Sequence, residues 1–229
     1  MEATLAISQQ PIGEVSPLIY GGFLEHMGRS IYEGVYDPDS PLADKDGIRS
    51  DVVAALAELE IPIVRYPGGN FVSGYHWRDG VGPREQRPTV EEKAWKSIET
   101  NQFGTDEFMA LCHELDWQPM IAVNLGTGTP EEAREWLEYC KAASYSVPVW
   151  CLGNEMDGPW QIGHVPADQY AERASQTAKL LRDTDPSIET VACGSSDPVV
   201  KTLSLIHISE PTRLESKSRM AGYGGKGGG

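Results

Sequence analysis

Apolar and polar residues alternate along the chain in segments that are typical of strands and helices taken in turn. The segment 47–60 carries Ile48, Val52, Leu56 and Leu59 at nearly helical spacing, which predicts a helix with one buried stripe. Further helices are expected at 105–117, 129–141 and 166–183, and strands at 16–25, 118–125, 147–154 and 187–196. The segment 61–70 starts as a β-branched strand and is expected to break at Pro67-Gly68-Gly69. Because strands alternate with helices, we expect parallel βαβ units.

The helix expected at 129–141 has the clearest starting point. Thr129 stands at the capping position, Pro130 takes the first helical position, and Glu132 follows three residues after the cap. Together these residues form a capping box with proline at N1, which is a strong signal for the start of a helix.

Two architectures fit this alternation, a doubly wound sheet and a (β/α)8 barrel. The glycine patterns that hold phosphates are not met, since GTGTPE (126–131) lacks the last glycine of GxGxxG and GYGGKGGG (222–229) lacks the Walker spacing. The polar residues found where strands end are Glu25, Arg65, Asn70, Asn124, Asn154 and Glu155. In a barrel such strand ends face one pocket. We therefore predict an α/β fold, a (β/α)8 TIM barrel truncated after about five strands.

Charge and hydropathy exclude several classes of partner. The 229 residues carry a formal net charge of -15, so phosphate backbones and anionic membrane surfaces would repel the chain. No apolar run approaches the roughly 20 residues that a membrane helix needs. We expect no nucleic-acid partner and no membrane partner, whereas an uncharged sugar substrate is compatible with this charge.

The cysteines and histidines give no metal pattern. The four cysteines form no CxxC pair, and the five histidines form no HExxH motif or close pair, so we expect no metal site and no cofactor. Scattered thiols fit a reducing compartment. The start of the chain, MEATLAISQQPIGEV, lacks the basic and apolar regions of a signal peptide, and a cytoplasmic location is expected.

The segment VWCLGNEMDGPW (149–160) carries the most informative chemistry, because a short apolar strand runs directly into Asn154 and Glu155. Breaking a glycosidic bond needs a proton donor and a second carboxylate. A glutamate with apolar neighbours suits the first role. The candidates for stacking on a sugar ring are Trp77, Trp95 and Trp160. Residue types alone leave it equally open that Glu155 is a surface residue in a tight turn formed by Asn154 and Asp157.

The segment CLGNEMDGPWQIGH (151–164) closely resembles the acid/base segment of the α-L-arabinofuranosidases of glycoside hydrolase family fifty-one. Four further segments match that family in the same order: GGFLEHMGRSIYEGVYDP (21–38), VRYPGGNFVSGYHWRDGVGPREQRP (64–88), AWKSIETNQFGTDEFM (94–109) and VNLGTGTPEEA (123–133). The resemblance implies a retaining hydrolase with a (β/α)8 barrel followed by a β-sandwich. It also implies exo-acting removal of terminal arabinofuranosyl groups from arabinan, arabinoxylan and related oligo- or polysaccharides, by enzymes that tend to form hexamers.

Roles for single residues follow from the same resemblance. Glu155 would be the general acid/base, and Asn154 would bind the 2-hydroxyl of the sugar. Three residues would line the same subsite, namely Glu25, Arg65 and Asn70, and Trp95 would shape its mouth. The alternatives are a plain ion pair between Arg65 and Glu25, a turn-capping role for Asn70 and a core position for Trp95. An endoglucanase of the same family is the alternative activity.

The chain departs from the family in two places. The connection between Cys140 and Val147 is shorter than usual, and we expect it at the bottom of the barrel, away from the chemistry. The family's nucleophile, a glutamate at the end of the seventh strand, is missing. Residues 1–202 are expected to be the amino-terminal part of the barrel. Residues 203–229 are expected to be a non-native, disordered tail, because LSLIHISEPTR (203–213) resembles a translated sequencing adapter. Such a fragment would be inactive, with at most weak sugar binding.

Overall fold

The computed structural model describes residues 13–194, and five parallel strands form its central sheet. In the order in which they lie side by side, these strands are β1 (Gly22–Phe23), β2 (Ile63–Tyr66), β5 (Gln118–Val123), β6 (Val149–Leu152) and β7 (Glu189–Ala192). The predicted tail 203–229 and the boundary after residue 202 lie outside the described residues.

The order of the strands decides between the two predicted architectures. A doubly wound sheet reverses its strand order at a switch point. Here each strand of the central sheet pairs with the strand of that sheet that precedes it in the chain. Phe23 lies opposite Arg65, Tyr66 opposite Ile121, and Leu152 opposite Ala192. Such a sequential, all-parallel order is that of a (β/α)8 barrel. The predicted fold class is confirmed, with five of the strands within the described residues.

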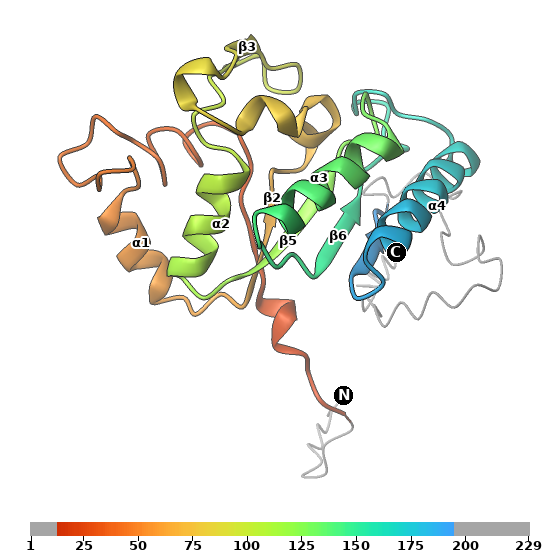
Figure 1. Ribbon diagram of the computed structural model, residues 1–229, viewed down its shortest axis with the longest axis horizontal. Helices are drawn as coiled ribbons and strands as arrows, with labels where there is room; N and C mark the ends of the chain where they lie inside the picture. Colours follow the sequence, from red (N-terminus) through yellow and green to blue (C-terminus); the bar gives the residue numbers. More distant parts are fainter. Residues whose placement is uncertain (1–12, 195–229) are drawn as a thin grey trace, which may run out of the picture.

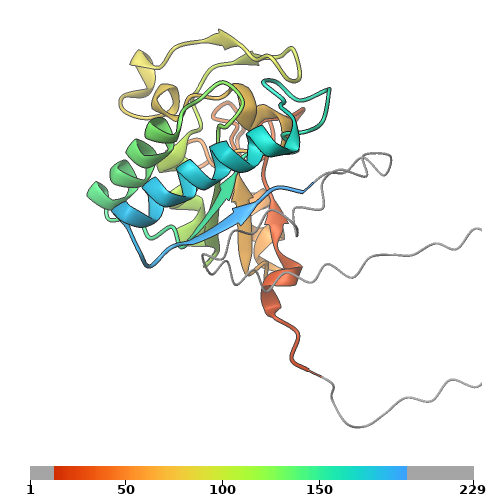
Figure 2. The same ribbon diagram turned by 90° about the vertical axis from the view of Figure 1, so that its right-hand side faces the viewer.

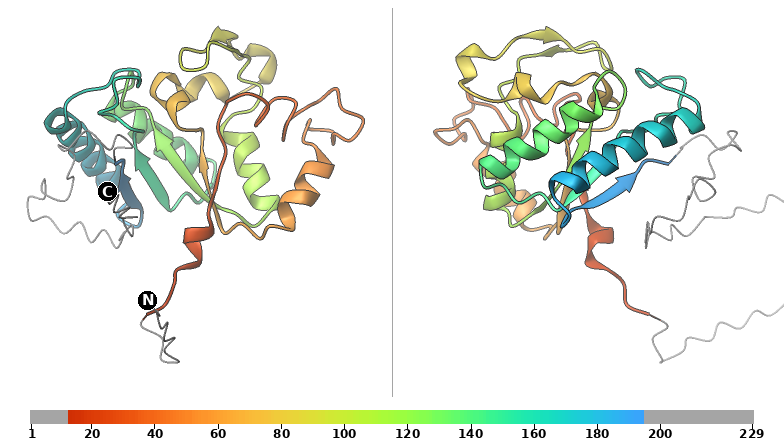
Figure 3. Two further views of the ribbon diagram at one scale, coloured as in Figure 1. Left: turned by 180° about the vertical axis from the view of Figure 1, so that it is seen from behind. Right: turned by 45° about the vertical axis from the view of Figure 1, so that its right-hand side comes forward.

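Helices connect these strands and lie on one side of the sheet. They are α1 (Ser50–Ala57), α2 (Thr105–Glu114), α3 (Pro130–Ala142) and α4 (Ala167–Thr184). Figures 1 and 2 show α3 and α4 packed side by side over the sheet. In the rear view of Figure 3 (left panel), α1 and α2 lie at the right of the view and α4 lies at the left, so the helices follow one another along the sheet. This arrangement matches the outer helical layer of a barrel.

A long excursion between β2 and α2 covers the carboxyl ends of the strands. It contains three short 3-10 helices (Asn70–Gly74, Trp77–Gly80 and Arg84–Gln86) and a hairpin of β3 (Val90–Glu91) and β4 (Ile98–Glu99). A further 3-10 helix, Pro17–Tyr20, precedes β1. In Figure 1 the β3–β4 hairpin lies at the top, on the side toward which the strands run.

The strands present different faces to two apolar clusters. Outward residues such as Tyr66, Ile121 and Trp150 pack against the helices and form the main core. Inward residues form a smaller cluster in which Ala122 and Cys151 meet Val72. This alternation follows from the two-residue period of a strand. The barrel interior is thus lined by the same face of the sheet that carries Arg65.

Four predicted segments need correction. The helix expected at 47–60 spans only Ser50–Ala57, and Leu59 is exposed because it lies in the turn after the helix. The strand expected at 16–25 is mostly not a strand, since its first half is the 3-10 helix with exposed apolar side chains. The strands expected at 118–125 and 147–154 end earlier, at Val123 and Leu152, where loops begin. The strand in 61–70 ends at Tyr66, directly before the predicted break at Pro67.

The start of α3 is confirmed at Thr129, whose hydroxyl oxygen accepts a hydrogen bond from the backbone N–H of Glu132 at 3.1 Å. The second half of the predicted capping box differs. The carboxylate of Glu132 contacts the Nδ1 atom of His76 at 2.9 Å, so it joins α3 to the loop after β2. A long-range partner therefore replaces the local one that the capping box predicts.

The connection 143–148 leads from α3 to the amino end of β6, at the bottom of the barrel as predicted. Beside it lies an open depression of about 610 Å³, bordered by residues such as Trp117, Gln118 and Tyr145. Because this depression adjoins the amino ends of β5 and β6, it lies at the opposite end of the sheet from Asn154 and Glu155.

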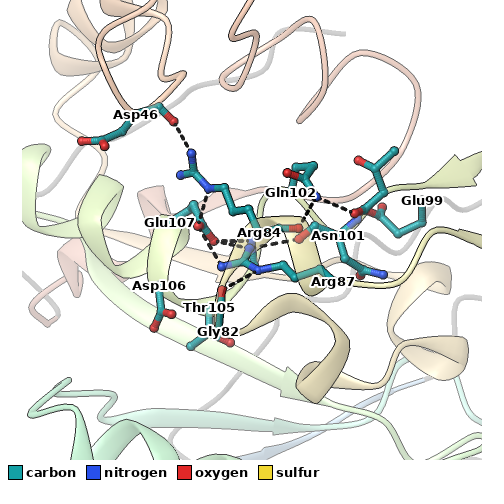
Figure 4. A network of polar contacts seen from close by, with 12 residues as sticks. Asp46, Gly82, Arg84, Arg87, Glu99, Asn101, Gln102, Thr105, Asp106 and Glu107 are labelled. Carbon is teal, nitrogen blue, oxygen red and sulfur yellow. Dashed lines mark hydrogen bonds and ion pairs between the residues drawn. The ribbon is translucent and has the colours of Figure 1, made fainter.

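A buried polar network fixes the excursion to α2 (Figure 4). The carboxylate of Glu107 accepts hydrogen bonds from Arg87 at 3.0 and 3.1 Å, from Arg84 at 3.0 Å and from the Gly104 N–H at 2.8 Å. Arg87 also donates to the backbone oxygens of Gly82 and Asn101, each at 3.0 Å. The network therefore holds both ends of the hairpin at the first turn of α2.

Candidate active site

The polar residues at the strand ends form a connected row. Arg65, in β2, donates through Nη2 to Asn154 Oδ1 at 3.2 Å and to the Gly153 backbone oxygen at 3.4 Å. Asn154, just after β6, donates through Nδ2 to Asn70 Oδ1 at 3.3 Å. The structure thus brings together three predicted site residues, from β2, from the loop after β6 and from the 3-10 helix Asn70–Gly74.

Two of the alternative roles predicted from the sequence are wrong for these residues, the ion pair of Arg65 and the turn-capping role of Asn70. Arg65 makes no ion pair with Glu25 within residues 13–194, since its guanidinium faces Asn154. Asn70 does not cap the 3-10 helix Asn70–Gly74, because Gly69 occupies the capping position and the Asn70 side chain contacts Asn154. The side chains of the row therefore face one another rather than serving local turns.

Glu25 lies beside the row, directly after β1, and is buried. Its Oε1 atom accepts hydrogen bonds from the Phe71 N–H at 3.1 Å and from the Trp95 indole Nε1 at 3.2 Å. Gly68 makes room for it: at a φ of 151°, a Cβ there would lie 2.4 Å from the Glu25 Cγ atom. The Pro-Gly-Gly turn is required because the chain passes against this carboxylate.

Trp95 lies at the tip of the β3–β4 hairpin and is 41% exposed, so the predicted alternative of a core position is wrong. The buried carboxylate of Glu92 accepts the backbone N–H groups of Ala94 at 2.5 Å and Trp95 at 2.6 Å. These two bonds close the tip and aim the indole at Glu25. Sequence reasoning did not single out Glu92.

Glu155 follows Asn154 and is only half-buried. Its backbone has a φ of 42°, a left-handed conformation that is uncommon outside glycine, and its carbonyl accepts the Gly158 N–H at 2.8 Å. The turn predicted by the structural alternative is therefore present. The Glu155 side chain is nevertheless not a free surface group, because its Oε2 atom accepts a hydrogen bond from Trp160 Nε1 at 2.9 Å.

Gln161 also belongs to the site and was missed by the sequence reasoning. It is 2% exposed, and its Oε1 atom accepts from Asn154 Nδ2 at 3.4 Å. Its Nε2 atom donates to the hydroxyl of Ser73 and contacts the Asn70 backbone oxygen at 3.5 Å. A signal was available, since Gln161 falls inside the family-like segment 151–164.

His26 lies beneath the site and is a buried packing residue, not a surface one. Its ring stacks on Phe71 at 4.5 Å between centroids, and Nδ1 contacts the Glu99 carboxylate at 2.8 Å. Burial alone would raise the pKa of Glu99, but hydrogen bonds from His26, Tyr32 and the Asn101 N–H outweigh it and hold the pKa below its usual range. The hairpin end is thereby tied to the residue next to Glu25.

Trp77 does not reach the site, and its predicted stacking role is wrong. It is buried against Trp136, with ring centroids 6.1 Å apart, and its indole N–H donates to the backbone oxygen of Glu132 at 3.1 Å. Trp77 packs in the aromatic core because the loop after β2 folds back over α3.

Three other ionisable side chains lie near the site, Asp157, Cys151 and Cys193. Both carboxylate oxygens of Asp157 are buried and have no hydrogen-bond partner within residues 13–194, so no hydrogen bond links Asp157 to Glu155. Burial raises the pKa of the Cys151 and Cys193 thiols, although the Arg65 guanidinium opposes the shift. These thiols are therefore neutral and are poor nucleophiles.

Across residues 13–194, no group of three or more histidine, cysteine or carboxylate side chains is placed to hold a metal ion. No helix in this part of the chain has the length and apolar character needed to cross a bilayer.

Carboxylates, amides and an arginine thus meet at the carboxyl ends of successive parallel strands, flanked by two exposed indoles. In a barrel such a set of groups is typical of an enzyme whose substrate is a sugar. Charge-bearing and amide groups can satisfy hydroxyls, and indoles can cover a ring face.

Comparisons with known proteins identify the class more closely. The family model described as "Alpha-L-arabinofuranosidase 1 domain" matches residues 55–219. The chain is 51% identical over 207 residues to intracellular exo-alpha-(1->5)-L-arabinofuranosidase 1 of Bacillus subtilis, covering 83% of this chain and 41% of that protein. It is 49% identical over 203 residues to alpha-L-arabinofuranosidase C of Emericella nidulans, covering 82% and 40%.

Solved structures agree with the sequence comparisons. A family 51 α-L-arabinofuranosidase from Thermotoga petrophila matches with a TM-score of 0.78 and 46% identity, over 81% of this chain and 42% of that one. A second, from Bifidobacterium longum, matches with a TM-score of 0.80 and 41% identity, over 84% and 41%. The chain belongs to the α-L-arabinofuranosidase family, and it spans about two-fifths of the length of these relatives.

Proposed function

We propose that the whole protein is a retaining, exo-acting α-L-arabinofuranosidase with Glu155 as its general acid/base. The observation that carries the proposal is the position of Glu155, directly after β6 and next to the row formed by Arg65, Asn154 and Asn70. The family membership supports the same role, since the Bacillus relative is named as an exo-α-(1→5)-L-arabinofuranosidase.

In this mechanism Glu155 gives its proton to the leaving oxygen while the glycosidic C–O bond breaks and its electron pair stays on that oxygen. A second carboxylate bonds to the sugar carbon and forms the glycosyl-enzyme. Glu155 then takes a proton from water as the water attacks the sugar carbon, the bond from that carbon to the second carboxylate breaks with its electron pair returning to the carboxylate, and arabinose is released. The net charge of the two carboxyl groups is the same after each step, and both groups return to their starting states after the second.

The row would hold the sugar. Asn154 is proposed to bind the 2-hydroxyl, because its amide already lies between Arg65 and Asn70. Arg65 has a buried Nε–H without a partner within residues 13–194, which fits a hydrogen bond to substrate. Glu25 has Oε1 occupied by two donors, so Oε2 is the oxygen proposed to accept from a sugar hydroxyl.

The second carboxylate is proposed to come from the end of a seventh strand, outside the described residues. Within residues 13–194, Glu25 is the other carboxylate directly after a strand of the central sheet, and its Oε1 is held by Phe71 and Trp95. The 229-residue chain on its own is therefore proposed to be inactive, with at most weak sugar binding. We also propose that the whole protein acts in the cytoplasm on arabinan or arabinoxylan side chains and assembles as a hexamer.

The test starts by amplifying source DNA and sequencing across Lys201. We expect the frame to continue into further strands with a glutamate after the seventh, and we call that product the full-length protein. It should release arabinose from an aryl α-L-arabinofuranoside, whereas the 229-residue chain should not. A native frame that encodes LSLIHISEPTR and stops at Gly229 would refute the proposed boundary, and cleavage of internal glucan bonds would favour the endoglucanase alternative.

A further inference from the structure

The loop after β6 turns back so that its own tryptophan reaches Glu155. Trp160 donates its indole Nε1–H to Glu155 Oε2 at 2.9 Å while its ring remains 47% exposed. Within residues 13–194, no hydrogen bond is made to the other carboxylate oxygen, Oε1. The two oxygens of the proposed acid/base are therefore not equivalent.

The turn that brings Trp160 into this position depends on Gly158. A Cβ at Gly158 would lie 2.6 Å from the Cε2 atom of the Trp160 indole, so only glycine lets the ring pack against the backbone. The Gly158 N–H donates to the Glu155 carbonyl at 2.8 Å, and the Gly158 carbonyl accepts the Gln161 N–H at 2.9 Å. The indole and the carboxylate are thus held in one compact turn.

The far end of the turn is also fixed. Gln161, the residue after Trp160, is buried and contacts the side chains of Asn154 and Ser73. Because Asn154 precedes Glu155 and Gln161 follows Trp160, both ends of the turn are tied to the same polar row. The indole is therefore positioned by buried contacts, although its own ring faces solvent.

An indole N–H can donate a hydrogen bond but cannot accept one. While Trp160 donates to Oε2, that oxygen acts as an acceptor, and the proton of the carboxylic acid is favoured on Oε1, because the carbonyl oxygen of the acid is the better acceptor. We propose that Trp160 is a positioning residue, which assigns the catalytic proton to Oε1 of Glu155 and aims that oxygen at the leaving group. The inference rests on the proposed role of Glu155 as acid/base.

The step that Trp160 would assist involves no change in its own bonding. The proton moves from Glu155 Oε1 to the leaving oxygen as the glycosidic bond breaks. The negative charge that remains on the carboxylate is shared with Oε2, where the indole N–H stabilises it. A role of this kind affects substrates that need proton donation and spares those whose leaving group departs without it.

The experiment uses Trp160→Phe in the full-length protein, because phenylalanine keeps an aromatic ring and removes the donor. We compare kcat/KM, which reports formation of the glycosyl-enzyme, for an alkyl arabinofuranoside, a poor leaving group, and for a dinitrophenyl arabinofuranoside. We expect kcat/KM to fall by about tenfold or more on the first substrate and by less than about twofold on the second. KM should change little on either.

Trp95→Phe is the matched control. It also removes an indole donor from a site carboxylate, since Trp95 Nε1 donates to Glu25 Oε1 at 3.2 Å. Because Glu25 is proposed to bind the sugar and not to transfer the proton, Trp95→Phe should raise KM for both substrates alike. A purely stacking role for Trp160 would give this same pattern, and that result would overturn the proposal.

A second variant tests the same contact without changing Trp160, in case Trp160→Phe does not fold. Gly158→Ala leaves the indole present but displaces it, since the added Cβ would meet the ring. It should reproduce the selective loss on the poor leaving group. Equal activity of the wild type and both variants on the two substrates would also overturn the inference.

Glu155→Ala separates the proposed role of Glu155 from the proposed role of Trp160. If Glu155→Ala shows no selective loss on the poor leaving group, Glu155 is not the acid/base and the proposed function fails. If Glu155→Ala shows the selective loss and Trp160→Phe does not, Glu155 keeps its role and Trp160 is not its positioning residue.

Discussion

The buried ion pair between α2 and the loop 82–87 gives the sharpest test of how the excursion over the site is held. The proposed change is Glu107→Gln, which keeps the shape of the side chain and removes its charge. Arg87, whose side chain is only 3% exposed, then loses its charged partner. Arg84 and the Gly104 N–H lose a charged acceptor as well.

The expected loss follows from burial. Removing one partner of a buried ion pair destabilises a protein by roughly 3–5 kcal/mol, because the other charge is left uncompensated. Arg87 retains the backbone oxygens of Gly82 and Asn101 as acceptors, and glutamine still offers one oxygen. We therefore expect the lower end, about 3 kcal/mol, in the free energy of unfolding.

The effect has a defined dependence on pH. Burial alone raises the pKa of Glu107, but hydrogen bonds from Arg87, the Gly104 N–H and Arg84 outweigh it and hold the pKa below its usual range. A carboxyl with a lowered pKa in the folded state contributes stability above its unfolded pKa, and loses it as pH falls through the folded value. The difference between wild type and Glu107→Gln should be constant above about pH 5 and shrink below about pH 4.

Urea unfolding of the full-length protein, followed by tryptophan fluorescence, measures these differences. The matched control is Glu135→Gln, which breaks the exposed pair between Arg78 and Glu135, 57% and 37% exposed, and should cost about 0–1 kcal/mol. A loss for Glu107→Gln no larger than for this control would refute the reasoning, as would a difference that grows toward acid pH.

Three further changes test other parts of the structure. Tyr170→Phe should lower the free energy of unfolding by about 1–3 kcal/mol in urea titrations, because the hydroxyl bridges backbone groups at the ends of β6 and β7; no loss would contradict this. Glu92→Ala should raise KM with little change in melting temperature, since it frees the tip that aims Trp95; an unchanged KM would show that the indole positions itself. Gly68→Ala should abolish arabinose binding in calorimetry, because its Cβ would meet Glu25; normal binding would contradict the crowding argument.

Much of the fold could be predicted because its signals are local. Within residues 13–194, apolar periodicity located the four α-helices and the central strands, and the cap at Thr129 fixed the start of α3. The clustering of polar residues after strands indicated a barrel, and the sequential strand order agrees. Element ends were less predictable, as at Leu59, because an apolar residue just beyond a helix fits the helical spacing equally well.

The candidate site could be predicted only in part. Arg65, Asn70 and Asn154 were named from their places at strand ends, and they do contact one another. Glu92 and Gln161 were not, because their roles depend on where distant loops fold. Trp77 was misplaced for the same reason: nothing in its local sequence distinguishes a ring that packs on α3 from one that faces a pocket.

Glu155→Ala in the full-length protein, assayed with added azide, tests whether Glu155 is the acid/base of a retaining arabinofuranosidase. We expect kcat/KM, which reports formation of the glycosyl-enzyme, to fall by about 10²–10⁴-fold on a poor leaving group and much less on dinitrophenyl arabinofuranoside. On the second substrate kcat is then limited by the glycosyl-enzyme, because water has lost its general base. Azide should then restore turnover and give arabinosyl azide of retained configuration, because an anionic nucleophile needs no base to attack the glycosyl-enzyme. Equal losses on both substrates, or an azide product of inverted configuration, would contradict the assignment.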